Sequence, residues 1–366
     1  MKRKFVAVAV IVLNTIILFI SLEAFIGILR FAKYNIDKSK LTSHGKFSMV
    51  LDLEYAPWVQ FKVVDQKSAH TNVNGFLRSS QPYVCGDVKG KEDKISDIYF
   101  LGGSTMLGDG VSDDQTIPSL FASILESKNK KIGVRVWNYG QPYYYSTQEL
   151  FLLFSLIAEG RRPATVIFLD GLNECLALGS SYYRYPFFTP TLKEIFISGQ
   201  SRTPHLLAAL LQKTNLYYAL RKMNLTTDKG VNTRDFSYML PMGISEDECA
   251  QRIAQNYLDM IKTTQMLCKA FNIKCYFFWQ PVPYYNYDRS KDKICDKKSL
   301  PMFAKVFPII KENAKHTPEL YYLGDLLAEY KGSPFLDAFH YSSAFNRRIA
   351  DEMLKVVAIP NEYDAE

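Results

Sequence analysis

Short apolar runs alternate with helix-periodic segments from residue 96 to near the C-terminus. Runs typical of buried strands lie near 97–102, 134–139, 165–170 and 273–279, and a shorter one lies at 320–323. Between them, apolar residues recur every three or four positions, as in amphipathic helices. This alternation predicts a parallel sheet covered by helices on both faces. Functional side chains in such folds lie beyond the carboxyl ends of the strands.

Polar residues mark where several of these helices begin. Acidic side chains at 113–114 suit the N-terminus of a helix, and a further helix is expected at about 147–159. The run Ser245-Glu246-Asp247-Glu248 is a capping box that opens a long helix. Ser342 or Ser343 caps a final helix.

The N-terminal pattern is different. Three basic residues at 2–4 precede Phe5 to Leu22, a stretch without charge, and the apolar character resumes after Glu23 as far as Leu29. This length can span a bilayer, and the basic cluster predicts that the N-terminal end stays in the cytoplasm. A cleaved signal peptide is the alternative. The run is long for one and no Ala-x-Ala site follows, so we expect an uncleaved signal anchor, with the rest of the chain outside the cytoplasm on the periplasmic or extracellular side.

The chain is therefore expected to have three parts. Residues 1–33 form the signal anchor, 34–95 form a membrane-proximal spacer that packs on the domain, and 96–366 form the α/β domain. An insertion at about 176–244 interrupts the alternation and contains an aromatic cluster at 182–188. These aromatic residues could line a pocket, or they could pack the insertion onto the core.

Composition excludes some classes of function. Apolar content of 48% and charged content of 22% are typical of a globular protein. The net charge of +7 comes from scattered basic residues without a long run, which argues against nucleic-acid binding. Export would permit disulfides, but six cysteines allow fifteen complete pairings and the sequence selects none of them. The cysteines are Cys85, Cys175, Cys249, Cys268, Cys275 and Cys295.

The most informative chemistry is a serine combined with an Asp–His pair. Ser104 follows the strand-like run at 97–102, and Asp337 precedes His340 by three residues. The chain has five histidines, and only His340 has an acid in this arrangement. Serine becomes a nucleophile when a base takes its proton, and a carboxylate fixes the tautomer of that base. These residues predict a catalytic triad.

Two further segments supply candidate donors for an oxyanion. Gly140 ends the run that begins at Val136, and Asn173 lies in a Gly-x-Asn sequence directly after another strand-like run. A glycine permits close approach of the backbone, and an Asn side chain donates from an uncharged NH₂ group. Together with the N–H of Ser104, these groups form the predicted oxyanion hole.

The ordered set resembles the SGNH (GDSL-type) hydrolase family, and in particular its membrane-anchored bacterial members. The four matching blocks are Gly102-Gly103-Ser104-Thr105, Asn138-Tyr139-Gly140, Gly171-Leu172-Asn173-Glu174 and Asp337-Ala338-Phe339-His340. The resemblance covers roughly residues 95–358. It implies a flavodoxin-like three-layer α/β/α fold with a central parallel sheet, here preceded by one transmembrane helix.

The chain departs from the family pattern at two positions. Gly103 replaces the usual Asp before the serine, and Glu174 stands where Asp often follows the Asn. Neither change removes the nucleophile. The stretch Asn74-Gly75-Phe76-Leu77-Arg78 is also similar to the segment that precedes the first block in the membrane-anchored members.

Other hydrolytic classes fit less well. The α/β-hydrolase elbow requires Gly-x-Ser-x-Gly, and Met106 occupies the position of its last glycine. The chain contains no His-Glu-x-x-His, Cys-x-x-Cys or Walker-type sequence. We therefore expect no metal and no organic cofactor.

Tyrosines follow two of the predicted strand ends. Tyr143 and Tyr144 follow Gly140, and Tyr284 follows the strand at 273–279, so both loops should border the site. We predict that these three side chains contact substrate, with packing into the core as the alternative.

The predicted function is that of a serine esterase acting on acyl esters, with O-acetyl esters as the specific expectation, of an envelope or extracellular glycan or lipid. The same triad could transfer the acyl group to a sugar hydroxyl, which makes a glycan O-acetyltransferase the nearest alternative. A non-catalytic glycan-binding or assembly protein with a hydrolase fold is the alternative from another class.

Overall fold

The structure is a computed structural model that describes residues 2–38, 53–68, 70–81, 84–85, 95–128, 133–176, 214–222, 243–291 and 300–359. The chain divides into two compact units. One contains the described residues of 1–40 and 191–236, and the other contains those of 41–190 and 237–366. Most of the predicted insertion, including its aromatic cluster at 182–188, lies outside the described residues.

The larger unit is built on a mostly parallel sheet. Its parallel strands are β7 (Ser96–Gly102), β8 (Val134–Asn138), β9 (Thr165–Asp170), β10 (Lys274–Trp279) and β11 (Leu320–Tyr322). They lie in the order β8-β7-β9-β10-β11. Counted along the chain this is 2-1-3-4-5, the order of flavodoxin-like folds. The prediction of an α/β fold with a mostly parallel central sheet is confirmed.

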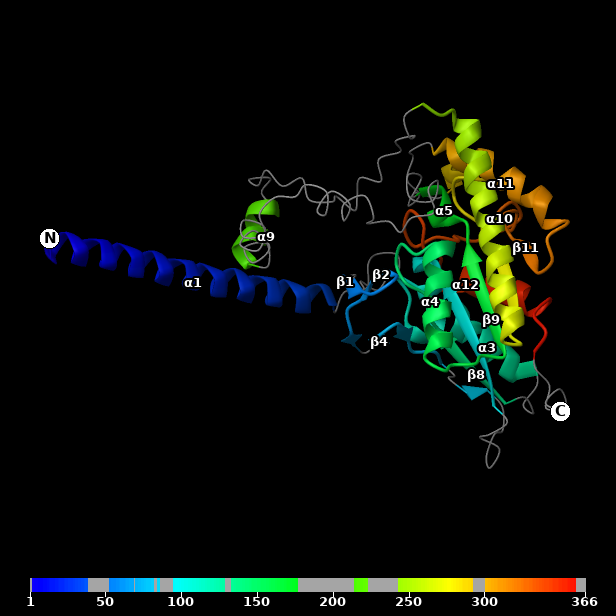
Figure 1. Cartoon of the computed structure of the whole chain (residues 1–366), viewed down its shortest axis with the longest axis horizontal. Helices are drawn as coiled ribbons and strands as arrows, with labels where there is room; N and C mark the ends of the chain where they lie inside the picture. Colours follow the sequence, from blue (N-terminus) through cyan, green and yellow to red (C-terminus); the bar gives the residue numbers. More distant parts are fainter. Residues whose placement is uncertain are drawn as a thin grey trace. The chain divides into compact units, whose positions relative to one another are not determined.

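Helices cover both faces of this sheet (Figure 1). Alternate side chains of β9 point to opposite faces, so Val166 and Phe168 belong to one core cluster while Ile167 and Leu169 belong to the other. The longer helices of the first cluster are α4 (Ser146–Ala158), α10 (Glu246–Ala270) and α11 (Pro301–Ala314). Those of the second are α3 (Ile117–Lys128) and α12 (Ser343–Leu354). The layers are therefore α/β/α.

Two of the predicted caps are present. The Ser245 hydroxyl accepts a hydrogen bond from the Glu248 N–H at 3.1 Å at the start of α10. Ser342, the first of the two serines considered, accepts from the Phe345 N–H at 3.4 Å at the start of α12. The acidic residues near 113 lie instead in the short 3₁₀ turn η2 (Asp113–Gln115), which leads into α3.

The described part of the predicted spacer extends the central sheet. A hairpin of β1 (Leu53–Ala56) and β2 (Gln60–Val63) comes first. Four short strands then join the sheet by antiparallel pairing on the β8 side. They are β3 (Gln66–Lys67), β4 (Asn72–Asn74), β5 (Leu77–Arg78) and β6 (Val84–Cys85). Runs of two or three residues carry no readable period, so the sequence did not predict them.

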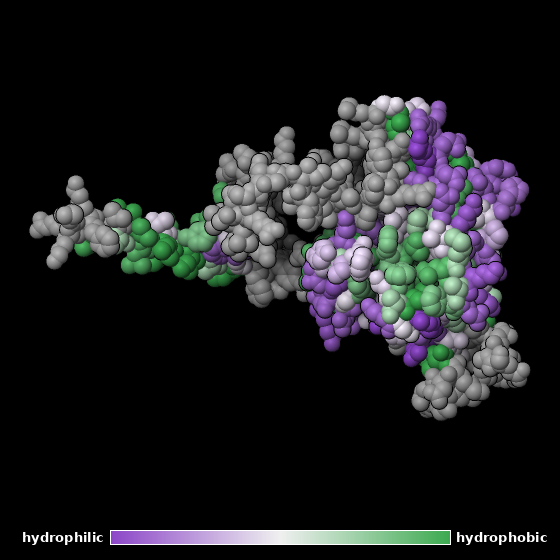
Figure 2. All heavy atoms as spheres, in the orientation of Figure 1, coloured by the Kyte–Doolittle hydropathy of each residue, from purple (hydrophilic) through white to green (hydrophobic). Residues whose placement is uncertain are grey.

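The smaller unit contains α1 (Lys2–Lys38) and α9 (Asn215–Lys222). Within α1, Ala9–Leu29 is long and apolar enough to cross a membrane, a criterion that a signal sequence also meets. Figure 2 shows hydrophobic residues along this helix. The Glu23 carboxylate accepts the N–H groups of Asn215 at 2.7 Å and Leu216 at 2.6 Å. Glu23, the acid inside the apolar run, thus accepts N–H groups at the start of α9 that have no partner within the helix.

Five of the six cysteines lie in the described residues, and all five are buried free thiols. They are Cys85, Cys175, Cys249, Cys268 and Cys275. Cys295 lies outside the described residues.

The outer side of α4 carries a different feature, an exposed apolar patch that includes Phe151 and Phe154 (Figure 2).

Candidate active site

Ser104 lies at the point where β7 gives way to a short helix. The strand ends at Gly102, and Ser104 is the first residue of α2 (Ser104–Leu107). Gly103 between them is closely packed, since a Cβ there would lie 2.5 Å from Asn173 Nδ2. Gly103 thus leaves room for the Asn173 amide.

The structure brings Ser104, His340 and Asp337 together. Ser104 Oγ lies 2.9 Å from His340 Nε2, and His340 Nδ1 lies 2.8 Å from Asp337 Oδ2. A carboxylate can only accept, so Nδ1 carries the proton and Nε2 presents its lone pair to the Ser104 hydroxyl. The nucleophile therefore contacts the base, and the base contacts the group that orients it.

Asp337 also shapes the loop that carries the base. Its Oδ1 accepts the backbone N–H groups of Phe339 at 2.9 Å and His340 at 2.8 Å. The backbone N–H of Leu336 donates to the His340 carbonyl at 2.8 Å. The spacing of three residues between Asp337 and His340 thus serves both the turn and the imidazole contact.

A buried polar network joins the nucleophile to the base. Gln280 Oε1 accepts the hydroxyl of Thr105 at 2.8 Å and that of Tyr341 at 2.9 Å. Each donor is the residue immediately after Ser104 or His340. Burial raises the pKa of Tyr341 well above its ordinary value, so its hydroxyl stays a donor. Sequence reasoning missed this network, although Gln280 occupies a strand end like the other site residues.

Asn173 lies in the first turn of α5 (Leu172–Leu176), directly after β9. One N–H of its amide donates to the Tyr144 carbonyl at 2.6 Å. The other has no acceptor within the described residues. Because the amide packs against Gly103, this second N–H lies near the nucleophile.

Gly140, a predicted oxyanion donor, lies in a closely packed turn after β8. Its single N–H donates to Asn138 Oδ1 at 3.0 Å, so it already has an acceptor. A Cβ at Gly140 would lie 2.2 Å from Leu107 N. The glycine is thus required for close packing of this turn against α2.

The three tyrosines predicted to bind substrate have different surroundings. Tyr144 is 1% exposed, and its hydroxyl donates to the Phe61 carbonyl of β2. Its ring belongs to the core, and its backbone carbonyl contributes to the site. Tyr143 is partly buried with φ of 64°. Tyr284, also partly buried, lies with its ring centroid 5.8 Å from that of Phe339, the neighbour of His340.

Three buried carboxyl groups lie behind the Asn173 turn. Glu174 accepts the N–H of Ser146 at 2.9 Å and that of Gly171 at 2.6 Å, so it ties two loops of the site together. Burial and the neighbouring Asp170 and Glu174 raise the pKa of Glu149 well above its usual range. Burial and Glu174 do the same for Asp170. Burial therefore favours the protonated form of Glu149 and Asp170.

A further carboxylate faces the base from the opposite side to Asp337. Asp109 Oδ2 lies 3.6 Å from His340 Nε2, and the side chain is 7% exposed. Sequence reasoning did not identify this residue. The signal available in the sequence was the Gly-Asp-Gly run at 108–110, which follows the nucleophile helix directly.

No cluster of three or more His, Cys, Asp or Glu side chains within the described residues is arranged to hold a metal ion. The arrangement at Ser104 can nevertheless perform acyl transfer, because nucleophile, base and amide donor converge on one point. Ser104, His340, Asp337 and Asn173 supply these groups.

No protein-family model matches this chain, and no curated protein matches it. Among solved structures, the chain is similar to an acetyl xylan esterase, AlAXEase, with 15% sequence identity, a TM-score of 0.41, and coverage of 72% of this chain and 100% of the other. It is also similar to a putative lipolytic protein of the G-D-S-L family from Desulfitobacterium hafniense DCB-2, at 12% identity, a TM-score of 0.38, and coverage of 72% and 99%. A third similar structure is TesA, at 12% identity, a TM-score of 0.38, and coverage of 71% and 97%.

Proposed function

We propose that the chain is a serine ester hydrolase of the SGNH type, with Ser104 as nucleophile, His340 as base and Asp337 as the group that orients the base. The observation that carries this proposal is the pair of contacts on one imidazole. Ser104 Oγ lies 2.9 Å from Nε2, and Asp337 Oδ2 lies 2.8 Å from Nδ1. Both distances are within hydrogen-bond reach, as general-base catalysis requires.

The reaction proceeds in two acyl-transfer steps. Ser104 Oγ attacks the ester carbonyl while its proton passes to His340 Nε2. The tetrahedral intermediate collapses, and the imidazolium returns the proton to the departing alcohol. Water then attacks the acyl-serine, with His340 again taking and returning one proton, and the carboxylic acid leaves. Asp337 stabilises the imidazolium that forms in each step.

The oxyanion that forms in both steps needs fixed donors. The free N–H of the Asn173 amide is the first, since that amide packs against Gly103. The backbone N–H of Ser104 is the second, because N–H groups in the first turn of a helix have no intrahelical partner. We leave Gly140 out of this set, since its N–H is donated to Asn138.

The substrate we propose is an acyl ester, with an O-acetyl group of an envelope or extracellular glycan or lipid as the specific case. Support comes from the resemblance of the four sequence blocks to SGNH hydrolases and from the candidate membrane segment Ala9–Leu29. An anchored domain outside the cytoplasm would meet such esters. Tyr143 and Tyr284 remain the proposed substrate contacts, since both are partly buried beside the site.

The nucleophile is tested by substitution and labelling. Ser104→Ala should lower turnover of p-nitrophenyl acetate by a factor on the order of 10⁶, while the melting temperature stays unchanged. A fluorophosphonate should label Ser104 in the wild-type protein. Ser127→Ala, an exposed serine at the end of α3, serves as the control and should retain full turnover and labelling. Normal turnover in the Ser104→Ala protein would overturn the proposal.

The fate of the acyl group is tested separately. The protein is incubated with an acetyl-ester donor and a glycan acceptor, and free acetate is measured beside acetylated glycan. The hydrolase proposal predicts acetate. Acetylated glycan, formed by the wild type and lost in Ser104→Ala, would identify a transferase that uses the same residues.

A further inference from the structure

The Asp109 carboxylate lies beside the imidazole of His340, the proposed base. Its Oδ2 lies 3.6 Å from His340 Nε2, the atom that also meets Ser104 Oγ at 2.9 Å. The Asp109 backbone N–H donates to the Ser104 carbonyl at 3.0 Å. The Asp109 backbone is thus bound to the helix that carries the nucleophile. Its carboxylate faces Nε2 of the imidazole, whereas Asp337 contacts Nδ1.

The local backbone fixes this orientation. Gly108 and Gly110, on either side of Asp109, have φ of 86° and 92°, the left-handed region that favours glycine. Gly108 is also the C-cap of α2, and a Cβ there would lie 2.6 Å from Thr116 Cγ2. Asp109 thus lies between two residues in the left-handed conformation, which gives this turn its sharp bend.

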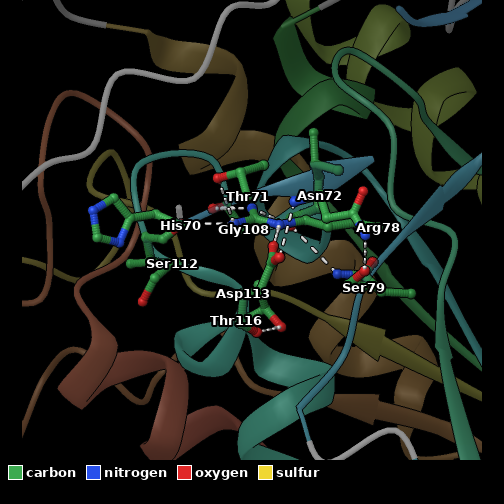
Figure 3. Close-up of polar contacts among 12 residues, drawn as sticks. His70, Thr71, Asn72, Arg78, Ser79, Gly108, Ser112, Asp113 and Thr116 are labelled. Atoms are coloured by element: carbon green, nitrogen blue, oxygen red, sulfur yellow. Dashed lines mark hydrogen bonds and ion pairs between the residues drawn. The ribbon is translucent and has the colours of Figure 1, made fainter. Parts of the chain in front are cut away.

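A buried arginine holds the same turn in place (Figure 3). Arg78 donates from Nη1 to the carbonyls of Leu107 at 2.8 Å and Gly108 at 2.6 Å, and from Nη2 to that of Val111 at 2.6 Å. Its Nε pairs with Asp113 Oδ1 at 2.8 Å. These bonds fix the backbone on both sides of Asp109, so the carboxylate has little freedom to turn away from His340.

We propose that Asp109 stabilises the imidazolium of His340 and so strengthens this histidine as the base for Ser104. The inference rests on the proposed function. An opposite charge within about 4–6 Å favours the charged form of an ionisable group. Each acyl-transfer step passes through an imidazolium, so a fixed carboxylate beside Nε2 lowers the barrier of both steps. Asp109 adds no covalent step and takes no proton itself.

The charges around His340 determine the sign of the effect. Asp337 faces Nδ1 and Asp109 faces Nε2, and both favour the imidazolium. Arg78 interacts electrostatically with Asp109, which opposes this effect in part. Asp113 pairs with Arg78 and reduces that opposition. Removing the Asp109 charge should therefore lower the proton affinity of His340.

The test is the pH dependence of kcat/KM for p-nitrophenyl acetate, which reports the ionisation of the free enzyme. The neutral imidazole is the active form, so activity rises with pH through the His340 pKa. Asp109→Asn, which keeps the shape of the side chain, should move this acidic limb down by about 1–2 pH units. The plateau should fall about tenfold, since one unit of proton affinity corresponds to a factor of ten. Asp114→Asn removes an exposed charge from the same loop and should leave the limb unmoved.

An acidic limb that is unchanged in a folded Asp109→Asn protein would overturn the inference. A second readout does not depend on activity. In the Ser104→Ala background, the His340 ring titration followed by NMR, assigned with His340→Gln, should shift down on Asp109→Asn. If Asp109→Asn does not fold, a His340 pKa at or below about 6.5, the ordinary value, in the Ser104→Ala protein overturns it. Full turnover in Ser104→Ala would reject the proposed function instead, and the titration would still decide whether Asp109 acts on His340.

Discussion

The hydroxyl of Tyr341 lies 2.9 Å from Gln280 Oε1 and 2.5 Å from the Pro281 carbonyl, which ties the residue after the candidate base to the first residues after β10. The same Gln280 oxygen accepts the Thr105 hydroxyl at 2.8 Å. The nucleophile and the base come from chain segments far apart in sequence. The residues that follow them, Thr105 and Tyr341, nevertheless contact the same buried amide of Gln280. We infer that this amide helps to hold Ser104 and His340 at their contact distance of 2.9 Å.

Tyr341→Phe removes one donor of this network and leaves the ring in place. A lost hydrogen bond of about 1 kcal/mol should reduce kcat by roughly threefold to tenfold, with KM little changed, because the base is less well positioned. The measurement is steady-state kinetics together with thermal melting. Tyr330→Phe, which removes a hydroxyl from a partly buried tyrosine outside the network, is the control. Unchanged kcat with a lowered melting temperature would assign Tyr341 to stability alone.

The contacts of the His340 imidazole predict how the triad variants rank in their loss of kcat. His340→Ala should be about as harmful as Ser104→Ala, whereas Asp337→Ala should cost on the order of 10⁴ in kcat, because Asp337 orients the base and takes no part in bond making. Asp337→Asn should also lose about 10⁴, since its amide favours the wrong tautomer at Nδ1. Single-turnover acylation by p-nitrophenyl acetate measures this order. Activity within tenfold of wild type in His340→Ala would remove His340 from the mechanism.

The sequence predicted the parts of the site that depend on strand ends. Ser104 and Asn173 follow β7 and β9, which are adjacent in the sheet, so their meeting follows from parallel topology once those strands are identified. His340 could be selected because one acid stood three residues before it. These predictions needed only local patterns and one rule of topology.

The remaining features depend on contacts that no local pattern encodes. The Gly140 N–H is occupied because the Asn138 side chain folds back on its own turn. Tyr144 is drawn into the core because β2 presents the Phe61 carbonyl to its hydroxyl, and β2 lies in a segment whose strands are too short to show a period. The Gly-Asp-Gly run marks Asp109 in the sequence, but its proposed role also depends on contacts of the distant, buried Arg78.

Asn173→Ala tests the amide donor. Loss of one oxyanion donor typically lowers kcat by about 10²–10³, and KM should change little because the donor acts on the transition state. Gly103→Ala should give a smaller fall in kcat, since a Cβ there would press on the Asn173 amide, at 2.5 Å from Nδ2. Gly160→Ala provides a matched control at a glycine whose Cβ would meet nothing within 4 Å, although its φ of 88° will cost some stability. Full activity in folded Asn173→Ala would place the oxyanion donor elsewhere.

The N-terminal helix gives a prediction about topology. If Ala9–Leu29 anchors the chain with its basic end in the cytoplasm, alkaline phosphatase fused after residue 366 should be active in cells, and the protein should stay in the membrane fraction. A cytoplasmic reporter at the same position should be inactive. The opposite pair of results would reverse the orientation, and release of a shortened protein would indicate cleavage of a signal sequence.

The buried carboxyl groups behind Asn173 predict how stability changes with pH. Burial and the neighbouring carboxylates raise the pKa of Glu149 in the folded state above its unfolded value of about 4.3. Between these two values the folded protein holds a proton that the unfolded chain releases, so the free energy of unfolding falls as pH rises, by at most about 1.4 kcal/mol per pH unit. Below about pH 4.3 both states are protonated and the effect is absent.

Glu149→Gln keeps a neutral side chain at every pH and should remove this dependence. The melting temperature of the wild type should fall between pH 5 and pH 8 by more than that of Glu149→Gln, and the variant should be the more stable protein at pH 8. Glu159→Gln removes a largely exposed carboxyl just after α4 and should follow the wild type. Parallel pH profiles for wild type and Glu149→Gln would mean that Glu149 is ionised in the folded protein.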